Sequence, residues 1–260
     1  MAEREPKELG DIRVEVSSRA DACTWVRRCA VGGQGSLVRP TRLYLVRHGA
    51  TQLTAEDRFS GAVGVDLSEE GRRQAARLGE RLRDEGLAGI YASPMSRSVE
   101  TAQIIAGACG LTPVLREELC EISHGPWEGF TRREVAARFA DDYAAWEQDP
   151  FTFAPPGAES GVAVLARALP VMREIVTRHA TQSVLVVSHK ATIRLVLCSL
   201  LGIDARGYRD RLDQSPACLN VLDFKDPVRA RLMLFNDTSH YAEHPRQPQD
   251  HLSGWWDRGR

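Results

Sequence analysis

Short apolar segments alternate with longer amphipathic ones along most of the chain, and this alternation limits the folds that it can adopt. Leu43–Val46 and Val184–Val187 are apolar runs that are rich in strand formers and too short for a helix. Ile90–Ala92 is a third short segment of this kind. A helical pattern follows each of them, so we expect β-then-α units. The fold class that this predicts is a three-layer α/β/α sandwich with a mostly parallel central sheet.

Two of the expected helices have clear start signals. Ser68 can cap a helix that carries apolar residues at helical spacing, and Ser93-Pro94 opens another that runs toward Gly110. The remaining expected elements are a helix with Val135, Phe139, Tyr143 and Trp146 on one face, a helix from Ser160 to His179 that Pro170 kinks or divides, an apolar helix through Ile193 and Leu200, and an antiparallel pair of strands at Asn220–Phe224 and Arg231–Phe235.

The chain divides into three parts by its pattern. Residues 1–40 mix charge, serine and glycine, and only Ile12–Val16 alternate like a strand, so we interpret them as a partly disordered extension. Residues 41–242 carry the β-then-α pattern and are expected to form one catalytic domain. Residues 243–260 are a polar tail that contains proline. A length of 260 residues is near the upper limit for a single core.

Charge and cysteine content exclude several classes of protein. Lysine and arginine number 34 against 35 acidic residues, so no global field favours nucleic acid or an anionic membrane. The sequence offers neither a signal peptide nor an apolar segment of membrane-spanning length, and we expect a cytoplasmic protein. The 6 cysteines are scattered without a CxxC pair, which is typical of reduced thiols. Any anion site must therefore be local.

Two histidines follow the clearest predicted strands. His48 comes directly after the first strand, and His189 comes after the strand at Val184–Val187. Because ligands of parallel sheets gather outside the carboxyl ends of the strands, we expect both side chains at the same edge. Arg97 falls in the first turn of a helix, where free backbone amides already favour an anion. Arg47 ends the first strand, and Glu121 lies in a glycine-containing loop. We therefore expect two arginines, two histidines and one carboxylate to converge.

These residue types suit phosphoryl transfer. Its transition state spreads charge over three equatorial oxygens, so catalysis consists mainly of positioning and electrostatic stabilisation. The planar guanidinium groups of Arg47 and Arg97 match that charge, and His189 adds a donor. His48 must be neutral to attack phosphorus, and cationic neighbours lower the pKa of an imidazole in that direction. No metal ion or cofactor is required.

The motifs together resemble the histidine phosphatase superfamily, also called the phosphoglycerate mutase-like family, from Arg42 to Tyr241. The resemblance rests on Arg47-His48-Gly49, on the stretch from Ser93-Pro94 to Arg97, on the Glu121 loop and on the late His189. It implies that His48 accepts the phosphoryl group, that Arg47, Arg97 and His189 bind phosphate, and that Glu121 is the general acid and base. It also implies a metal-independent reaction.

The sequence departs from the family pattern at a few positions. Thr54 stands where many members carry asparagine, and its hydroxyl can still donate a hydrogen bond to phosphate. Ser60 and Gly61 are expected to neighbour the substrate. Lys190 directly follows His189 and adds a cation near the pocket rim, where we interpret it as a solvated charge in preference to a substrate contact.

The leading hypothesis from the sequence is a phosphomonoesterase that acts on a small phosphorylated metabolite, such as a sugar phosphate or a phosphoglycerate derivative. The segment between Glu121 and His189 is shorter than the one typical of the family's mutases, which favours hydrolysis. Alternatives are a phosphoglycerate-type mutase, a non-catalytic protein that binds phosphorylated ligands, and a protein phosphotyrosine phosphatase. A homodimer also stays open as an alternative to a monomer.

Overall fold

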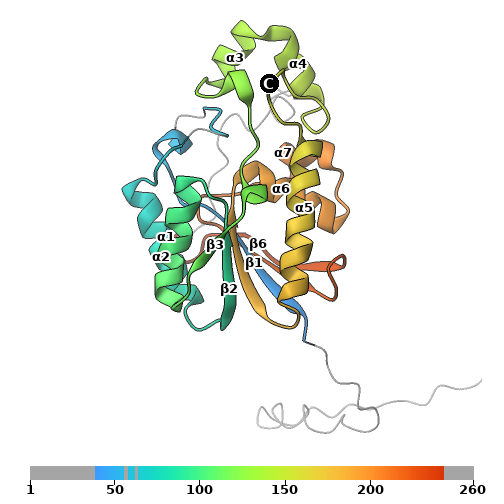
Figure 1. Cartoon of the computed structure of the whole chain (residues 1–260). Coiled ribbons are helices and arrows are strands. Elements are labelled where there is room, and N and C mark those ends of the chain that lie inside the picture. Colours follow the sequence, from blue (N-terminus) through green and yellow to red (C-terminus); the bar gives the residue numbers. More distant parts are fainter. Residues whose placement is uncertain (1–38, 56–57, 62–63, 243–260) are drawn as a thin grey trace, which may run out of the picture. The chain divides into compact units, whose positions relative to one another are not determined.

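A six-stranded sheet forms the centre of the computed structural model, which describes residues 39–55, 58–61 and 64–242 (Figure 1). Its strand order is β3-β2-β4-β1-β5-β6. The strands are β1 (Thr41–Arg47), β2 (Leu87–Ala92), β3 (Pro113–Leu115), β4 (Ser183–Ser188), β5 (Leu219–Phe224) and β6 (Ala230–Asp237). β1, β2, β3 and β4 are parallel, whereas β5 runs antiparallel to β1 and β6 antiparallel to β5. The mostly parallel sheet and the final hairpin are confirmed.

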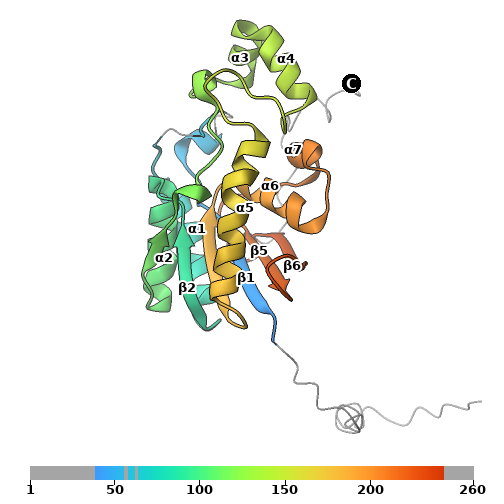
Figure 2. The ribbon, with the colours of Figure 1, turned by 45° about the vertical axis from the view of Figure 1, so that its right-hand side comes forward.

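Helices cover both faces of this sheet. In Figures 1 and 2, α1 and α2 lie on one side and α5 and α6 on the other, while α3 and α4 lie together beyond one end of the sheet. The helices are α1 (Glu69–Leu82), α2 (Ser96–Cys109), α3 (Arg132–Arg138), α4 (Ala140–Gln148), α5 (Gly161–Arg178), α6 (Lys190–Leu201) and α7 (Tyr208–Arg211). Short 3-10 helices are η2 (Gln52–Ala55), η3 (Glu117–Leu119), η4 (Gly125–Trp127) and η5 (Ala205–Gly207).

The alternating side chains of β1 explain the two helical layers. Leu43 and Leu45 pack in the apolar cluster that includes residues of α5 and α6, whereas Tyr44 and Val46 pack in the cluster that includes residues of α1 and α2. A strand buried on both faces has no polar alternation, which is why β1 is an almost continuous apolar run. The predicted three-layer α/β/α sandwich is confirmed.

The helix starts at Ser68 and Ser160 are as predicted. The Ser68 hydroxyl accepts a hydrogen bond from the Gly71 N–H at 3.1 Å, and Ser160 accepts one from Ala163 at 3.2 Å. The predicted division at Pro170 does not occur, because α5 continues through it. Pro170 lies on the exposed side, where water can satisfy the carbonyl that loses its partner, and the buried face holds the helix together.

The single helix predicted through Val135 and Trp146 is wrong in one respect. The structure has α3 and α4 instead, with a break at Phe139, whose φ of −133° and ψ of 51° are not helical. The predicted side chains still converge on one aromatic cluster, which comprises Phe59, Trp127, Val135 and Trp146 with Phe130, Phe139, Tyr143 and Phe153 around them. Helical spacing predicted the contacts but not the break, because Phe139 keeps its place in the cluster.

We expect Trp127→Ala to lower the free energy of unfolding by about 3–5 kcal/mol, because it removes the central ring of the aromatic cluster. Trp127 is 0% exposed, and its ring centroid lies 5.5 Å from that of Phe59 and 5.6 Å from that of Trp146. Urea denaturation measures the loss. The control is Met233→Ala, at a side chain 50% exposed, which should change stability by less than about 0.5 kcal/mol. Equal effects of the two substitutions would contradict the assignment of this cluster as a core.

Several predictions fall partly or wholly outside the described residues. The expected strand Ile12–Val16 and the polar tail lie outside them, so the domain boundaries stay a prediction.

Of the cysteines, Cys109, Cys120, Cys198 and Cys218 are described, and each is a free thiol. Within the described ranges, none of the helices combines the length and apolar character that crossing a bilayer requires.

Candidate active site

Three parallel strands end at the same edge of the sheet and bring the candidate residues together. Arg47 is the last residue of β1 and pairs in register with Ser188, the last residue of β4. The chain continues in register for one more step, since the His48 N–H donates to the Ser188 carbonyl at 3.0 Å. Beside β4, the Ser93 N–H donates to the Val187 carbonyl at 3.1 Å. The edge therefore gathers Arg47, His48, Ser93 and His189, as expected for parallel strands.

His48 is held as a neutral imidazole with one nitrogen available. Its Nδ1 lies 2.8 Å from the Gly49 carbonyl oxygen, which can only accept, so Nδ1 carries the proton and Nε2 has the lone pair. The Gly49 N–H in turn donates to the Thr101 hydroxyl of α2 at 3.1 Å. Burial, followed by the charges of Arg47 and Arg97, holds the pKa of His48 well below its ordinary value of 6.5.

His189 has the opposite arrangement of protons. The Arg97 Nε–H donates to its Nδ1 at 3.3 Å, so in the neutral ring Nε2 carries the proton and donates to the Ser93 hydroxyl at 2.8 Å. Ser98 adds a second hydroxyl 3.3 Å from the same nitrogen. Burial, His48 and Arg97 lower the pKa of His189 well below 6.5. The two imidazole centroids are 5.1 Å apart.

The two arginines are buried beside these rings and held by backbone carbonyls. Arg47 donates to the Gln214 carbonyl at 2.6 Å, and Gln214 is fixed by a side-chain hydrogen bond to Asn220 at 3.0 Å. Arg97 is 3% exposed, and burial lowers its pKa. We call Arg47, His48, Arg97 and His189 the histidine–arginine cluster. Its cationic side chains concentrate positive charge at the carboxyl edge of the sheet.

Ser60 and Gly61 contact Arg97 through their backbone. Their carbonyl oxygens accept hydrogen bonds from the Arg97 terminal nitrogen at 3.3 Å and 2.8 Å. A side chain at Gly61 would bring its Cβ within 1.9 Å of the Ile122 carbonyl oxygen, so this close approach requires glycine. The structure thus brings both residues to the cluster, and their contact with substrate stays a prediction.

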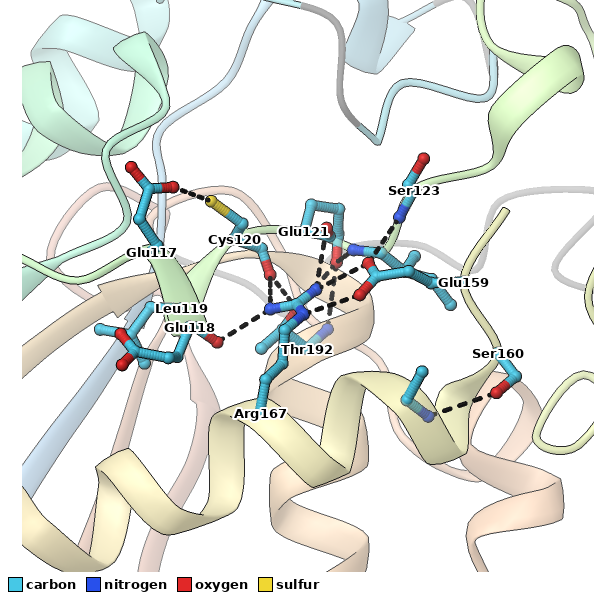
Figure 3. Close-up of polar contacts among 12 residues, drawn as sticks. Glu117, Glu118, Leu119, Cys120, Glu121, Ser123, Glu159, Ser160, Arg167 and Thr192 are labelled. Atoms are coloured by element: carbon cyan, nitrogen blue, oxygen red, sulfur yellow. Dashed lines mark hydrogen bonds and ion pairs between the residues drawn. The ribbon is translucent and has the colours of Figure 1, made fainter. Parts of the chain in front are cut away.

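Glu121 lies against the start of α6 (Figure 3). Its Oε1 accepts from the N–H groups of Ile122 at 2.9 Å and Thr192 at 3.1 Å and from the Thr192 hydroxyl at 3.2 Å. Its Oε2 accepts from the Ala191 N–H at 3.0 Å. Since α6 begins directly after His189, this contact fixes the carboxylate close to the cluster, and it adds negative charge within electrostatic reach of Arg97.

Lys190 is not the freely solvated charge that the sequence suggested. Its ammonium lies 3.5 Å from Asp213, which also pairs with Arg194 at 3.0 Å. Burial, Arg194 and Arg47 lower the pKa of Lys190 to about 7. The sequence could not reveal the contact between Lys190 and Asp213, because the two residues are distant along the chain. The loop that follows α7 brings Asp213 to Lys190.

We expect the free energy of unfolding to fall as the pH drops below 6.5. In the unfolded chain His48 binds a proton near 6.5, whereas its folded pKa is lower, so protons favour the unfolded state in the window between these values. The slope is at most about 1.4 kcal/mol per pH unit for this residue.

Urea denaturation of the wild type and of His48→Asn at about pH 7.5 and pH 5.5 isolates this contribution. Between about pH 7.5 and pH 5.5, the free energy of unfolding of the wild type should fall by roughly 1 kcal/mol more than that of the variant. Equal losses in both proteins would contradict a lowered pKa of His48.

The other site predictions have mixed outcomes. Thr54 belongs to η2, but its side chain lies outside the described part of the chain. Sequence reasoning missed the supporting roles of Thr101, Ser93 and Ser98, although all three lie in or beside the motif around Arg97. It also missed Gln214, whose backbone carbonyl leaves no signature in a sequence. Among the described residues, no group of three or more histidine, cysteine or acidic side chains could hold a metal ion.

The fold and these side chains define an α/β protein with a buried histidine–arginine cluster at the carboxyl edge of its sheet. The model of the histidine phosphatase superfamily (branch 1) matches residues 43–238. The chain belongs to this superfamily.

Individual relatives agree with that assignment. Phosphoserine phosphatase 1 of Hydrogenobacter thermophilus is 37% identical over 163 residues, which are 63% of this chain and 77% of that protein. The bifunctional protein Rv2228c of Mycobacterium tuberculosis is 36% identical over 211 residues, 80% of this chain but 57% of that protein. The solved structure of mycobacterial glucosyl-3-phosphoglycerate phosphatase Rv2419c is similar with a TM-score of 0.69 and 29% identity, covering 76% of this chain and 99% of that one. The chain thus spans little more than half the length of one of these relatives.

Proposed function

We propose that the protein is a phosphomonoesterase that hydrolyses a small phosphorylated metabolite through a phosphohistidine on His48, with Glu121 as general acid and base. The observation that carries the proposal is the state of His48. Its Nδ1–H is bonded to the Gly49 carbonyl, which leaves the Nε2 lone pair available, and burial and the charges of Arg47 and Arg97 lower its pKa. A neutral imidazole so oriented is a nucleophile for phosphorus.

In the first half-reaction, the His48 Nε2 attacks phosphorus while the bond from phosphorus to the ester oxygen breaks. Arg47, Arg97 and His189 stabilise the charge on the equatorial oxygens. Protonated Glu121 gives its proton to the leaving oxygen, which departs as an alcohol. The Oε2 atom suits this task, because it accepts the single hydrogen bond from Ala191 and keeps a lone-pair position for the proton.

In the second half-reaction, water attacks the phosphoryl group and the bond from phosphorus to nitrogen breaks. Ionised Glu121 takes a proton from that water, which restores its acid form. His48 regains its Nε2 lone pair, and inorganic phosphate leaves. The cycle consumes one ester and one water and needs no further reactant.

The proposed substrates are small phosphate monoesters. Two of the relatives carry names that specify phosphatases of phosphoserine and of glucosyl-3-phosphoglycerate, and each of these compounds is a small phosphate monoester. These names support a metabolite as substrate for this chain and favour a hydrolase over a mutase.

The test is a panel of phosphorylated metabolites, with inorganic phosphate and isomeric products both quantified. Phosphate release in the presence of excess chelator supports the proposal. Formation of an isomer without phosphate release would favour the mutase alternative. Stoichiometric binding of phosphorylated ligands without any turnover would favour the non-catalytic alternative.

A further inference from the structure

Arg167 of α5 uses its whole guanidinium group within the protein (Figure 3). Its Nε donates to Glu159 at 2.8 Å, and one terminal nitrogen donates to the carbonyls of Glu118 and Cys120, each at 2.8 Å. The other terminal nitrogen donates to the Glu121 carbonyl at 3.1 Å and to Glu159 at 2.9 Å. A guanidinium has five N–H donors, and these contacts occupy all of them. Arg167 therefore has none left for a substrate phosphate.

The contacts of Arg167 lie along the segment that carries Glu121. Three of them go to backbone carbonyls between Glu118 and Glu121, so the guanidinium holds one edge of that segment. Glu159 extends the attachment to Ser123. Its carboxylate accepts a hydrogen bond from the Ser123 N–H at 3.0 Å, and its backbone N–H donates to the Ser123 carbonyl at 2.8 Å. The backbone is thus fixed immediately before and after Glu121.

The pairing of Arg167 with Glu159 favours the ionised form of the Glu159 carboxylate. Although burial acts to raise the pKa of Glu159, the hydrogen bonds from Arg167 and from the Ser123 N–H lower it. The planar fork meets both carboxylate oxygens, and a lysine could not reproduce this geometry. The attachment therefore depends on the shape of arginine and not only on its charge.

We propose that Arg167 is a positioning residue for the general acid, and this inference rests on the proposed function of Glu121. The Glu121 carboxylate reaches the start of α6 only if its backbone sits at the right distance from Ala191 and Thr192. Arg167 holds that backbone in place from α5. Loss of the fork lets the segment shift, and the Oε2 atom moves out of line with the leaving oxygen.

The leaving group provides a selective test. A nitrophenolate leaves without a proton, whereas a plain phenolate benefits from one, so phenyl phosphate needs the acid more than 4-nitrophenyl phosphate. We expect Arg167→Lys to lower kcat/KM for phenyl phosphate by about tenfold or more, and for 4-nitrophenyl phosphate by less than about twofold. The parameter kcat/KM is the right one because it reports the formation of the phosphoenzyme.

The control is Arg116→Lys. Arg116 also pairs bidentately near this segment, with Glu118 and Glu174 side chains, but it has no contact with the backbone at Glu121. Its substitution should leave kcat/KM unchanged for both phenyl phosphate and 4-nitrophenyl phosphate. If Arg167→Lys does not fold by circular dichroism, Glu159→Gln weakens the same attachment and should show the same selectivity to a smaller extent.

A double-mutant cycle completes the experiment. In a Glu121→Gln background, Arg167→Lys should cause no further selective loss, because the acid is already absent. An equal loss on both substrates, or an undiminished selective loss in that background, overturns the positioning role. Selective loss in Glu121→Gln but not in Arg167→Lys overturns the positioning role alone. If Glu121→Gln itself shows no selective loss, the proposed acid role fails and the positioning role falls with it.

Discussion

Replacing His48 with alanine is expected to lower kcat/KM for an aryl phosphate by at least about a thousandfold while the protein stays folded. The substitution removes the Nε2 lone pair that the Gly49 contact leaves available, whereas the Nδ1 of His189 is already occupied by the Arg97 Nε–H. Steady-state assays of phosphate release measure the loss of kcat/KM, and circular dichroism checks that the variant is folded.

The matched control for this substitution is His179→Ala. His179 lies at the end of α5 and contacts Tyr91 and Gln182, away from the cluster. Its loss should leave kcat/KM within about twofold of the wild type, as for other substitutions remote from a site. Turnover by folded His48→Ala at a rate near that of the wild type would refute the proposed nucleophile.

Replacing Arg97 with lysine is expected to lower kcat/KM by about a hundredfold, although the charge is kept. The Arg97 Nε–H orients His189, and its terminal nitrogen binds the Ser60 and Gly61 carbonyls. An ammonium group cannot make these contacts and also present a planar pair of donors to phosphate. The same assays measure the effect.

The control for Arg97→Lys is Arg73→Lys on the exposed surface of α1. Arg73 pairs with Glu70 one turn away, and exposed pairs of this kind contribute little. Its activity should equal that of the wild type. If Arg97→Lys also retains full activity, charge alone is sufficient at this position and the fork has no role in the reaction.

Most of the central sheet could be predicted from the sequence because β1, β2 and β4 are apolar on both faces. The edge strand β3 could not, since Val114 and Leu115 are each 49% exposed and three residues carry no periodicity. The four-residue α7 was missed for the same reason of length. The break at Phe139 was missed because the pattern of contacts continues through it. Periodicity reports which side chains are buried, and it says little about short elements.

The candidate site was predictable where side-chain identity carries the information. His48 and His189 follow strands that pair in register, so their proximity follows from the sheet alone. The contacts that orient them depend on backbone carbonyls, at Gly49 for His48 and at Gln214 for Arg47, and any residue supplies a carbonyl. The attachment of Glu121 to α6 and to Arg167 likewise depends on backbone groups. These supports can be found only in three dimensions.

The most direct measurement of the central claim is the identity of the phosphorylated residue during turnover. The protein is mixed with 4-nitrophenyl phosphate, quenched under denaturing alkaline conditions that preserve phosphohistidine, digested and mapped by mass spectrometry. The account predicts an acid-labile phosphoryl group on His48 that is absent from His48→Ala. A phosphoryl group on any other side chain, or its persistence in His48→Ala, would contradict it.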